Sequence, residues 1–394
     1  MLARCSRGAS YDLRRPQYGF PLRFHETRQN SSLPERTRKL PNRGERFTLK
    51  PWQRNFLIGG ALGIVISQGW LYYDGRRRTG AFVPYSLAVK EPVSSTASIF
   101  HLAPKEKSPN LEIYKEAWEK GVWNVHFKQP QLQILRAYTP LPPLENATGP
   151  EKEHLRFLIR HDPHGEVSSY LHRLPIGAEI ELQGPNLEYE ITPDVRQVVF
   201  FAGGTGIAPA LQVAHALFEG EPSAADAALR SKRTLHILWA NRKREDCLGG
   251  VNDAPPDEPV PPKPTWSGLF TTPRPKPIPP VLEEKGAIVR ELEDLKRKHP
   301  GQITVEYFVN AEDTWIGEDA VFKALSRFDD KDFTTGYATP QEQRQILVSG
   351  PPGFISYLAG PKEWRNGREE QGPVSKIIAH AISRNPHNVK VWKI

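Results

Sequence analysis

A glycine-rich turn stands directly between an apolar strand and a helical pattern in the second half of the chain. The strand, VVFFA, ends at Ala202, and apolar residues recur at helical spacing over Ala210–Phe218. The turn consists of Gly203, Gly204, Thr205, Gly206, Ile207, Ala208 and Pro209. Three glycines let a ligand approach the backbone, and Pro209 suits a first helical turn because it lacks an N–H donor. Because this order of elements binds the pyrophosphate of a dinucleotide, the sequence predicts a nucleotide-binding α/β unit.

The residues after this turn continue the alternation of strands and helices. LHILWAN, ITVEYFV and QILVSG are typical of apolar strands, and Ile288–Lys298 of a charged amphipathic helix. We therefore expect a parallel sheet over 190–394. The segment 249–280 contains eleven prolines and interrupts this pattern, so we predict an extended surface loop there.

The residues before the turn follow a different pattern. Short alternating runs, separated by Pro, Gly, Asn and Asp, predict strands of four to six residues. These runs are Ser86–Val89, Ser98–Leu102, Val122–Phe127, Leu132–Leu135, Leu155–Ile159 and Glu179–Leu182. Such spacing is typical of a small antiparallel barrel, which we place at 81–187, with the change of architecture near Gly184–Pro193. The predicted fold is thus an antiparallel barrel followed by a parallel-sheet domain.

The first eighty residues have the composition of a targeting and anchoring segment. Residues 1–50 hold twelve basic and four acidic residues and carry the whole net charge of +8. The neutral remainder makes nucleic-acid binding by the body unexpected. Arg- and Ser-rich, acid-poor sequence is typical of a mitochondrial leader, with a disordered basic tail as the alternative. The uncharged run Phe56–Tyr73 predicts a transmembrane helix at 54–75, with a buried helix or the core of a signal peptide as the alternatives. A leader followed by such a helix would place the body in the intermembrane space of mitochondria.

Cysteine and histidine usage limits the metal chemistry. Two cysteines, Cys5 and Cys247, exclude a disulfide framework and an all-cysteine iron–sulfur cluster. The histidines of the barrel region do not share a helical face, and we predict no metal site from them. They are His154, His161, His164 and His172.

The segment Arg136–Thr139 lies at the end of a predicted strand. Alternate side chains on a strand point the same way, so Arg136 and Tyr138 share a face. A flavin needs a cation for its pyrophosphate, an aromatic surface for its ring system and a hydrogen bond near N5. A surface arginine beside a core tyrosine is the alternative interpretation.

Two further segments have the features of anion-binding turns. Gly165 precedes Val167 and Ser168 at a helix start, where free N–H groups suit a phosphate. Ser349, Gly350 and Pro351 follow the strand QILV, at the sheet edge where ligands bind in such folds. An ordinary N-cap and a plain turn are the respective alternatives.

In this order and spacing, the four segments resemble the ferredoxin–NADP⁺ reductase superfamily, and within it the NADH–cytochrome b5 reductase-like branch. The resemblance covers residues 81–394. It implies an FAD-binding barrel, an NAD(P)H-binding domain, and hydride transfer from nicotinamide to flavin N5.

The resemblance also implies a role for each candidate residue. In the barrel, Arg136 would contact the FAD pyrophosphate, Tyr138 and Thr139 would meet the isoalloxazine, and Gly165, Val167 and Ser168 would hold the phosphates. In the second domain, the NAD(P)H pyrophosphate would be cradled by Gly203, Gly204, Thr205, Gly206 and Pro209, with Thr205 near the nicotinamide. Asn241 and Arg242 would meet the adenosine end, and Gly350 and Pro351 would also bind the cofactor. Tyr138, Thr139 and Ser349 are the predicted catalytic residues. Ser349 departs from the cysteine usual in the family.

The leader, the single anchor and the lack of a fused haem or iron–sulfur domain look like a narrower group. These are fungal mitochondrial flavoproteins that assist haem attachment to cytochrome c. That likeness implies electron transfer to haem iron at the inner membrane, with cytochrome c and its haem lyase as partners. A cytochrome b5 or quinone reductase, and a membrane-tethered scaffold with a vestigial flavin site, are the alternatives. The choice between NADH and NADPH stays open, because Arg242, Lys243 and Arg244 are candidates for a 2′-phosphate site.

Overall fold

The structure, a computed structural model, describes most of the chain beyond residue 80. The described residues are 81–105, 111–144, 151, 153–219, 230–253, 284–327, 344–365, 368–384 and 389–394. All of them fall within one compact unit, Val65–Ile394. The predicted leader at 1–50, the predicted membrane helix at 54–75 and residues 254–280 of the proline-rich insert lie outside the described residues. Within the described ranges, no helix is long and apolar enough to cross a membrane.

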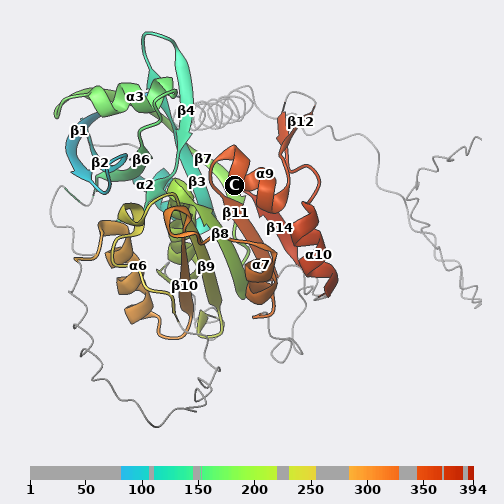
Figure 1. The fold of residues 1–394 in the computed structure, drawn as a ribbon. Coiled ribbons are helices and arrows are strands. Elements are labelled where there is room, and N and C mark those ends of the chain that lie inside the picture. The colour runs from blue at the N-terminus through green and yellow to red at the C-terminus, as the bar shows by residue number, and fades with distance from the viewer. Residues whose placement is uncertain are drawn as a thin grey trace, which may run out of the picture. The chain divides into compact units, whose positions relative to one another are not determined.

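The first domain is a seven-stranded antiparallel sheet in the order β4-β3-β7-β1-β2-β6-β5 (Figure 1). Its strands are β1 (Val83–Pro92), β2 (Ala97–Pro104), β3 (Gly121–Gln129), β4 (Ile134–Tyr138), β5 (Pro140–Leu141), β6 (Leu155–Arg160) and β7 (Glu179–Glu190). Two helices accompany them, α2 (Leu111–Lys120) and α3 (Glu166–Arg173). Alternation on β3 buries Trp123, Val125 and Phe127 completely, so one side of this strand forms the core of the barrel.

The β3–β4 hairpin differs from the sequence prediction. The alternating run placed a strand at Leu132–Leu135, whereas β4 begins only at Ile134. Gln133 has φ 55°, a left-handed conformation that belongs to a tight turn and not to a strand. Because the turn takes up the preceding residues, the paired strand shifts along the chain and includes Arg136 and Tyr138, which pair with Phe127 and Val125.

The second domain is built on a five-stranded parallel sheet in the order β10-β9-β8-β11-β14. These strands are β8 (Gln197–Gly203), β9 (Thr234–Asn241), β10 (Ile303–Val309), β11 (Arg344–Ser349) and β14 (Lys390–Lys393). The prediction of a parallel sheet is confirmed. Its central strands β8, β9 and β11 are buried along most of their length because helices cover both faces of the sheet.

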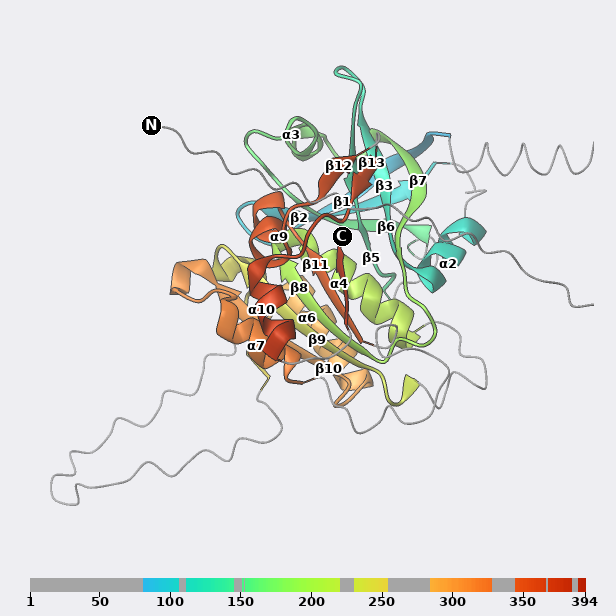
Figure 2. The ribbon, with the colours of Figure 1, turned by 90° about the vertical axis from the view of Figure 1, so that its right-hand side faces the viewer.

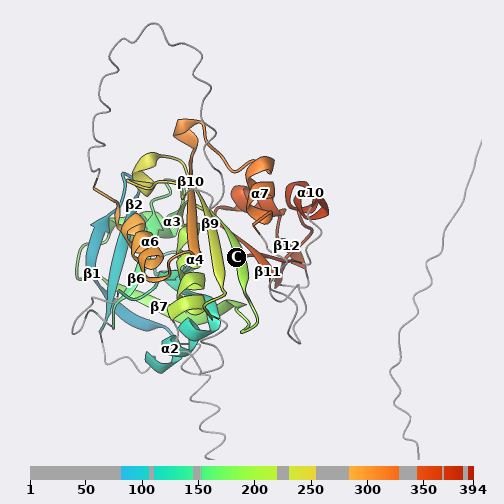
Figure 3. The ribbon, with the colours of Figure 1, turned by 90° about the horizontal axis from the view of Figure 1, so that it is seen from below.

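The helices of the second domain divide between these two faces. They are α4 (Ile207–Ala214), α6 (Ala287–Lys298), α7 (Glu318–Leu325), α9 (Pro352–Ala359) and α10 (Lys376–Arg384). Seen from below, α4 and α6 lie on one side of the strands, and α7 and α10 on the other (Figure 3). The buried residues follow this division, since Leu211 and Leu292 share one core and Val321 and Leu358 another.

A two-stranded hairpin, β12 (Glu363–Arg365) and β13 (Arg368–Glu370), follows α9 and has no counterpart in the sequence prediction (Figure 2). Its base is held by the buried ammonium of Lys393. This group donates to the carbonyl oxygens of Pro361 and Pro373, each at 2.9 Å, and also to that of Gln371. The hairpin is therefore anchored to the last strand of the sheet.

The two domains share a continuous interior. Barrel residues such as Ile99 and Leu158 belong to the same apolar cluster as Phe200 and Leu211 of the second domain. Gln212 of α4, fully buried, accepts a hydrogen bond from Trp123 N at 2.9 Å and donates to Pro140 O at 3.0 Å. Because buried apolar contacts and satisfied polar groups both cross the boundary, the domains are packed as one body.

Candidate functional site

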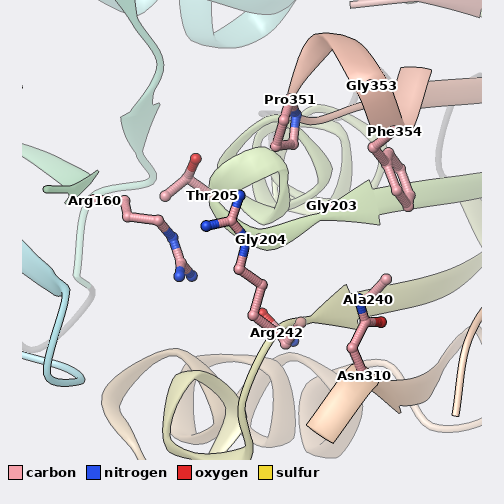
Figure 4. A pocket seen from close by; sticks show the side chains of 11 residues that line it. Arg160, Gly203, Gly204, Thr205, Ala240, Arg242, Asn310, Pro351, Gly353 and Phe354 are labelled. Atoms are coloured by element: carbon pink, nitrogen blue, oxygen red, sulfur yellow. The ribbon is translucent and has the colours of Figure 1, made fainter. Parts of the chain in front are cut away.

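A cavity of about 400 Å³ opens above the carboxyl ends of β8 and β9. It is lined by Arg160, Gly203, Gly204, Thr205, Ala240, Asn241, Arg242, Asn310, Pro351, Gly353 and Phe354 (Figure 4). The carboxyl edge of a parallel sheet is where ligands bind in open α/β folds. Arg160 comes from the barrel and the other residues from the second domain, so the cavity joins the two domains.

The glycine turn forms one wall of this cavity, and its shape depends on two of its glycines. Gly204 has φ +55°, a left-handed conformation in which a side chain is strained. A Cβ at Gly206 would lie 2.3 Å from the carbonyl oxygen of Ser349, so the turn packs directly on the backbone after β11. The indole of Trp239 on β9 donates to Gly204 O at 2.9 Å and holds the turn in place.

Two guanidinium groups face the cavity, and its lining contains no carboxylate. Figure 4 shows Arg160 and Arg242 reaching from opposite sides toward Gly204 and Thr205. With α4 beginning at Ile207, the start of a helix also points its N–H groups toward this end of the turn. The electrostatics of the cavity therefore favour an anionic ligand.

Arg160 also links the domains. Its guanidinium lies 2.8 Å from the buried carboxylate of Asp246, and Ser94 of the barrel donates to the same carboxylate at 2.7 Å. Beside them, Ser95 donates its hydroxyl to Glu245 at 2.6 Å. The short turn Arg244–Cys247 is thus attached to the barrel right next to the cavity.

Arg136 and Tyr138 lie on β4, outside this cavity. The Arg136 guanidinium is largely exposed and lies 3.8 Å from Glu166 at the start of α3. Tyr138 packs edge-on against Phe127, with ring centroids 4.8 Å apart. Burial raises the pKa of Tyr138 to about 12, so its hydroxyl stays protonated at neutral pH. Thr139 follows, half-buried, between β4 and β5.

Gly165, Val167 and Ser168 lie at the start of α3. Gly165 is the N-cap residue and offers no side chain to the free N–H groups of the first turn. Ser168 is nearly buried, and its hydroxyl accepts from Asp162 N at 3.1 Å and contacts Gly165 O at 3.2 Å. The hydroxyl thus shapes the loop before α3, while the first-turn amides remain available to an anion.

The other predicted residues lie around the cavity or directly behind it. Asn241 and Arg242 end β9, Pro351 precedes α9, and all three line the cavity. Ser349 is buried at the end of β11, against Gly206, and does not line it. Pro209 lies in the first turn of α4, as predicted.

Most of the predicted residues fall into two groups in the structure. Gly203, Gly204, Thr205, Asn241, Arg242 and Pro351 meet in one cavity. Arg136, Tyr138, Gly165, Val167 and Ser168 cluster on β4 and α3 of the barrel, where Arg136 approaches Glu166.

The cavity-lining residues that sequence reasoning did not single out include Arg160, Asn310 and Phe354. The signal for Arg160 was the alternation of β6, where Arg156, Leu158 and Arg160 share a face. Two charged residues on the outer face of a barrel strand, with an apolar one between them, indicate a surface covered by another domain. Phe354 packs on Gly203, where a Cβ would lie 2.8 Å from its ring, and this contact has no sequence signal.

The chain is similar to several known oxidoreductases and to one import factor. Residues 84–191 match the oxidoreductase FAD-binding domain family. NADH-cytochrome b5 reductase 2 of Candida glabrata is 25% identical over 232 residues, covering 58% of this chain and 59% of the relative. The cytochrome c mitochondrial import factor CYC2 of Saccharomyces cerevisiae is 29% identical over 180 residues, covering 41% and 47%. The chain therefore spans less than two thirds of the length of these relatives.

Among solved structures, the cytochrome b5 reductase domain of Ulva prolifera nitrate reductase is similar, with a TM-score of 0.46 and 18% identity. The match covers 79% of this chain and 97% of that domain.

The barrel of this chain is thus similar to oxidoreductase FAD-binding domains. NADH–cytochrome b5 reductases are among the relatives of the chain, and the predicted resemblance to them is confirmed.

The residues of the barrel fit FAD. Arg136 provides an exposed cation, whose ion-pair partner Glu166 is 3.8 Å away. Tyr138 provides an aromatic surface on the same strand, and the start of α3, which has no side-chain cap, provides free amides. Exposed ion pairs such as Arg136–Glu166 contribute about 0–1 kcal/mol, so a pyrophosphate can displace Glu166 at little cost.

Proposed function

We propose that this chain is an FAD-dependent NAD(P)H oxidoreductase. The observation that carries the proposal is the cavity at the carboxyl edge of the sheet. It is lined by the glycine turn and two arginines, and it is bordered by an FAD-binding domain through Arg160. The relatives named NADH–cytochrome b5 reductases support NADH as a donor.

In this proposal each group of residues has one task. Arg136 and the start of α3 hold the FAD phosphates, while Tyr138 and Thr139 position its ring system. Gly203–Pro209 and Arg160 bind the pyrophosphate of the nucleotide, with Thr205 at the nicotinamide. When bound, FAD accepts a hydride and gives up electrons singly. The backbone of Ser349 packs behind the glycine turn, against Gly206, and supports its shape.

For the electron acceptor we propose haem iron during cytochrome c maturation. The similarity to a mitochondrial import factor for cytochrome c supports this assignment. The basic, acid-poor segment 1–50 and the uncharged run Phe56–Tyr73 support a location at the mitochondrial inner membrane, with the body in the intermembrane space. Cytochrome c and its haem lyase would then be the partners.

The proposal is tested with purified full-length protein. We expect flavin absorbance bands, their loss on anaerobic addition of NADH or NADPH, and their return on mixing with haemin. Faster reoxidation by cytochrome b5 or a quinone would assign the alternative reductase function. Colourless protein that cannot be reconstituted with FAD would reject both reductase functions and support the alternative of a membrane-tethered scaffold.

Replacing Arg160 with alanine is expected to raise the dissociation constant for the nucleotide about 10- to 100-fold, because a charge-assisted pair to phosphate is lost. The FAD content should not change, since the predicted FAD ligands are on β4 and α3. Titration of the oxidised flavoprotein with NAD⁺ or NADP⁺ measures the first quantity, and absorbance the second.

The matched variant is Asp246→Asn, which removes the interdomain partner of Arg160 but keeps the guanidinium. It should lower thermal stability and leave nucleotide affinity within about threefold. Equal loss of affinity in both variants would mean that Arg160 acts only by holding the domains together.

A further inference from the structure

The turn between β3 and β4 is uncharged and exposes apolar side chains. Residues 129–135 contain no acidic or basic residue. Leu132 in the turn is 55% exposed, and Leu135 on β4 is 37% exposed. Figures 1 and 2 both show this hairpin extending past the other strands of the barrel. A projecting tip with exposed leucines indicates a surface that meets another apolar phase or molecule.

The apolar surface continues from the hairpin onto the outer face of the barrel. Leu135 pairs with Lys128 on β3, and the Lys128 ammonium lies 5.0 Å from the centre of the Phe82 ring. Glu181 on β7 neutralises this ammonium at 2.8 Å. Phe82, Lys128, Leu132 and Leu135 are called the hairpin patch below. The patch thus consists of apolar groups and one ammonium whose charge is balanced.

The hairpin patch is separate from the residues proposed to hold FAD. Neighbouring residues of a strand point to opposite faces of the sheet, so Leu135 faces away from Arg136. Tyr138 lies on the same side of β4 as Arg136 and packs against Phe127 in the core of the barrel. A ligand or surface on the hairpin patch therefore leaves the FAD residues free.

The chain enters the barrel at this patch. Phe82 directly precedes β1, and Val83 of β1 lies opposite Leu182, which in turn pairs with Phe127 of β3. The uncharged run Phe56–Tyr73 ends eight residues before Ala81, a stretch that spans at most about 30 Å when fully extended. If that run crosses a bilayer, the hairpin patch is among the parts of the barrel that this short connection holds closest to the lipid surface.

The composition of the connection favours the same arrangement. Residues 74–80 contain Arg76, Arg77 and Arg78 against the single acid Asp74. Arginines beside a membrane segment are attracted by anionic lipid headgroups, which draws the connection down onto the surface. Since Glu181 balances the charge of Lys128, the hairpin patch itself adds no net negative charge that would oppose this attraction.

We propose that the hairpin patch inserts into the headgroup region of the membrane that holds the chain, as a second contact beside the anchor. The inference rests on the membrane location in the proposed function. Apolar side chains of such surface-bound segments reach about 5–10 Å into the boundary between headgroups and acyl chains. Because the anchor already keeps the barrel near the bilayer, burial of two leucines is enough to favour the docked orientation at least about tenfold.

The test places one fluorescent label at the turn of the full-length chain. Leu132→Cys is combined with Cys5→Ser, while Cys247 is fully buried and stays unlabelled. The labelled protein is reconstituted into vesicles of phosphatidylcholine and phosphatidylglycerol. We expect nitroxide-bearing lipids to quench the label, and aqueous iodide to quench it at least about tenfold less than a label at a solvent-exposed position.

Val251→Cys, in the same background, supplies that exposed position, because Val251 is 74% exposed and belongs to the second domain. Its label should be quenched by iodide and not by the lipids. Equal access of iodide to the two labels would overturn the proposal. Protection from iodide without quenching by lipids would overturn it as well, since a protein surface would then cover the turn.

A charge introduced into the hairpin patch should release it from the bilayer. With the label at position 132, Leu135→Asp is expected to raise iodide quenching to the level of the Val251 label, because a carboxylate is costly to bury. Leu187→Asp is the matched control, since Leu187 is 46% exposed but lies on β7 opposite Trp123, toward the other end of β3. It should leave the label protected. Equal release by both variants would contradict an effect specific to the patch.

Two further measurements separate this inference from the proposed function. Extraction with alkaline carbonate tests the anchor, and flavin reduction by NADH or NADPH tests the reductase. A chain that stays in the bilayer with its label open to iodide would reject the hairpin patch alone. Release by carbonate would reject the membrane location and the patch together. A protected, lipid-quenched label without flavin reduction would sustain the patch and reject the reductase.

Discussion

Replacing Gly206 with alanine is expected to lower the free energy of unfolding by at least about 3 kcal/mol and to remove nucleotide binding. A Cβ there would lie 2.3 Å from the Ser349 carbonyl oxygen and 2.6 Å from its carbon, and both are backbone atoms that no side-chain rotation can move. The glycine turn and the turn after β11 would have to separate, which opens the cavity. Thermal unfolding should show a decrease in Tm of roughly 6–12 °C.

The matched control is Gly353→Ala, in the first turn of α9 on the same cavity. A Cβ at Gly353 meets no atom within 4 Å, and alanine is the better helix former by up to about 1 kcal/mol. This variant should keep or slightly raise Tm. If Gly206→Ala were as stable as Gly353→Ala, the close approach of the two turns would not hold in solution.

Replacing Arg156 with alanine is expected to cost about 3–5 kcal/mol of stability. Arg156 on β6 pairs with Glu291 on α6, and it also donates to Pro142 O at 3.1 Å. Only 6% of the Arg156 side chain and 18% of the Glu291 side chain are exposed, so the alanine variant would leave a buried carboxylate without its cation between the two domains. Chemical denaturation at pH 8 measures the loss.

The effect of Arg156→Ala should depend on pH in a defined direction. Burial raises the pKa of Glu291 although the neighbouring Arg156 lowers it, and removing Arg156 raises the pKa further. A carboxyl group whose pKa is higher in the folded than in the unfolded state binds its proton more tightly when the protein is folded. Such a group lowers the free energy of unfolding as the pH rises from its unfolded-state pKa to its folded-state pKa. The loss in the alanine variant should therefore be smaller at pH 5 than at pH 8.

The double variant Arg156→Met/Glu291→Leu is the companion measurement. Apolar residues of similar size often replace a buried ion pair at little cost, so this variant should be within about 1 kcal/mol of the original chain. A double variant as unstable as Arg156→Ala would show that the pair itself, and not the unpaired carboxylate, determines the stability of the domain boundary.

The local patterns of the sequence predicted the elements that carry the glycine turn and the parallel sheet. The run VVFFA is apolar throughout because both faces of β8 are covered. In ITVEYFV only alternate residues of β10 are fully buried. The predicted strand before Arg136 began two residues too early, because the left-handed turn residue Gln133 has no sequence pattern that marks it as a turn. The β12–β13 hairpin was missed, since its strands have three residues each, too few for an alternation to be seen.

The sequence by itself determined the kinds of group that the site contains: glycines that allow close approach, a strand with Arg136 and Tyr138, and a second strand that ends in Asn241 and Arg242. Each of these depends on a spacing of a few residues, which local backbone geometry converts into a turn or a shared face. Only the tertiary structure decided which charges stay free, because pairing depends on residues far apart in the chain. Glu312 neutralises Arg244, Asp246 holds Arg160 across the domain boundary, and Arg242 is left to face the cavity.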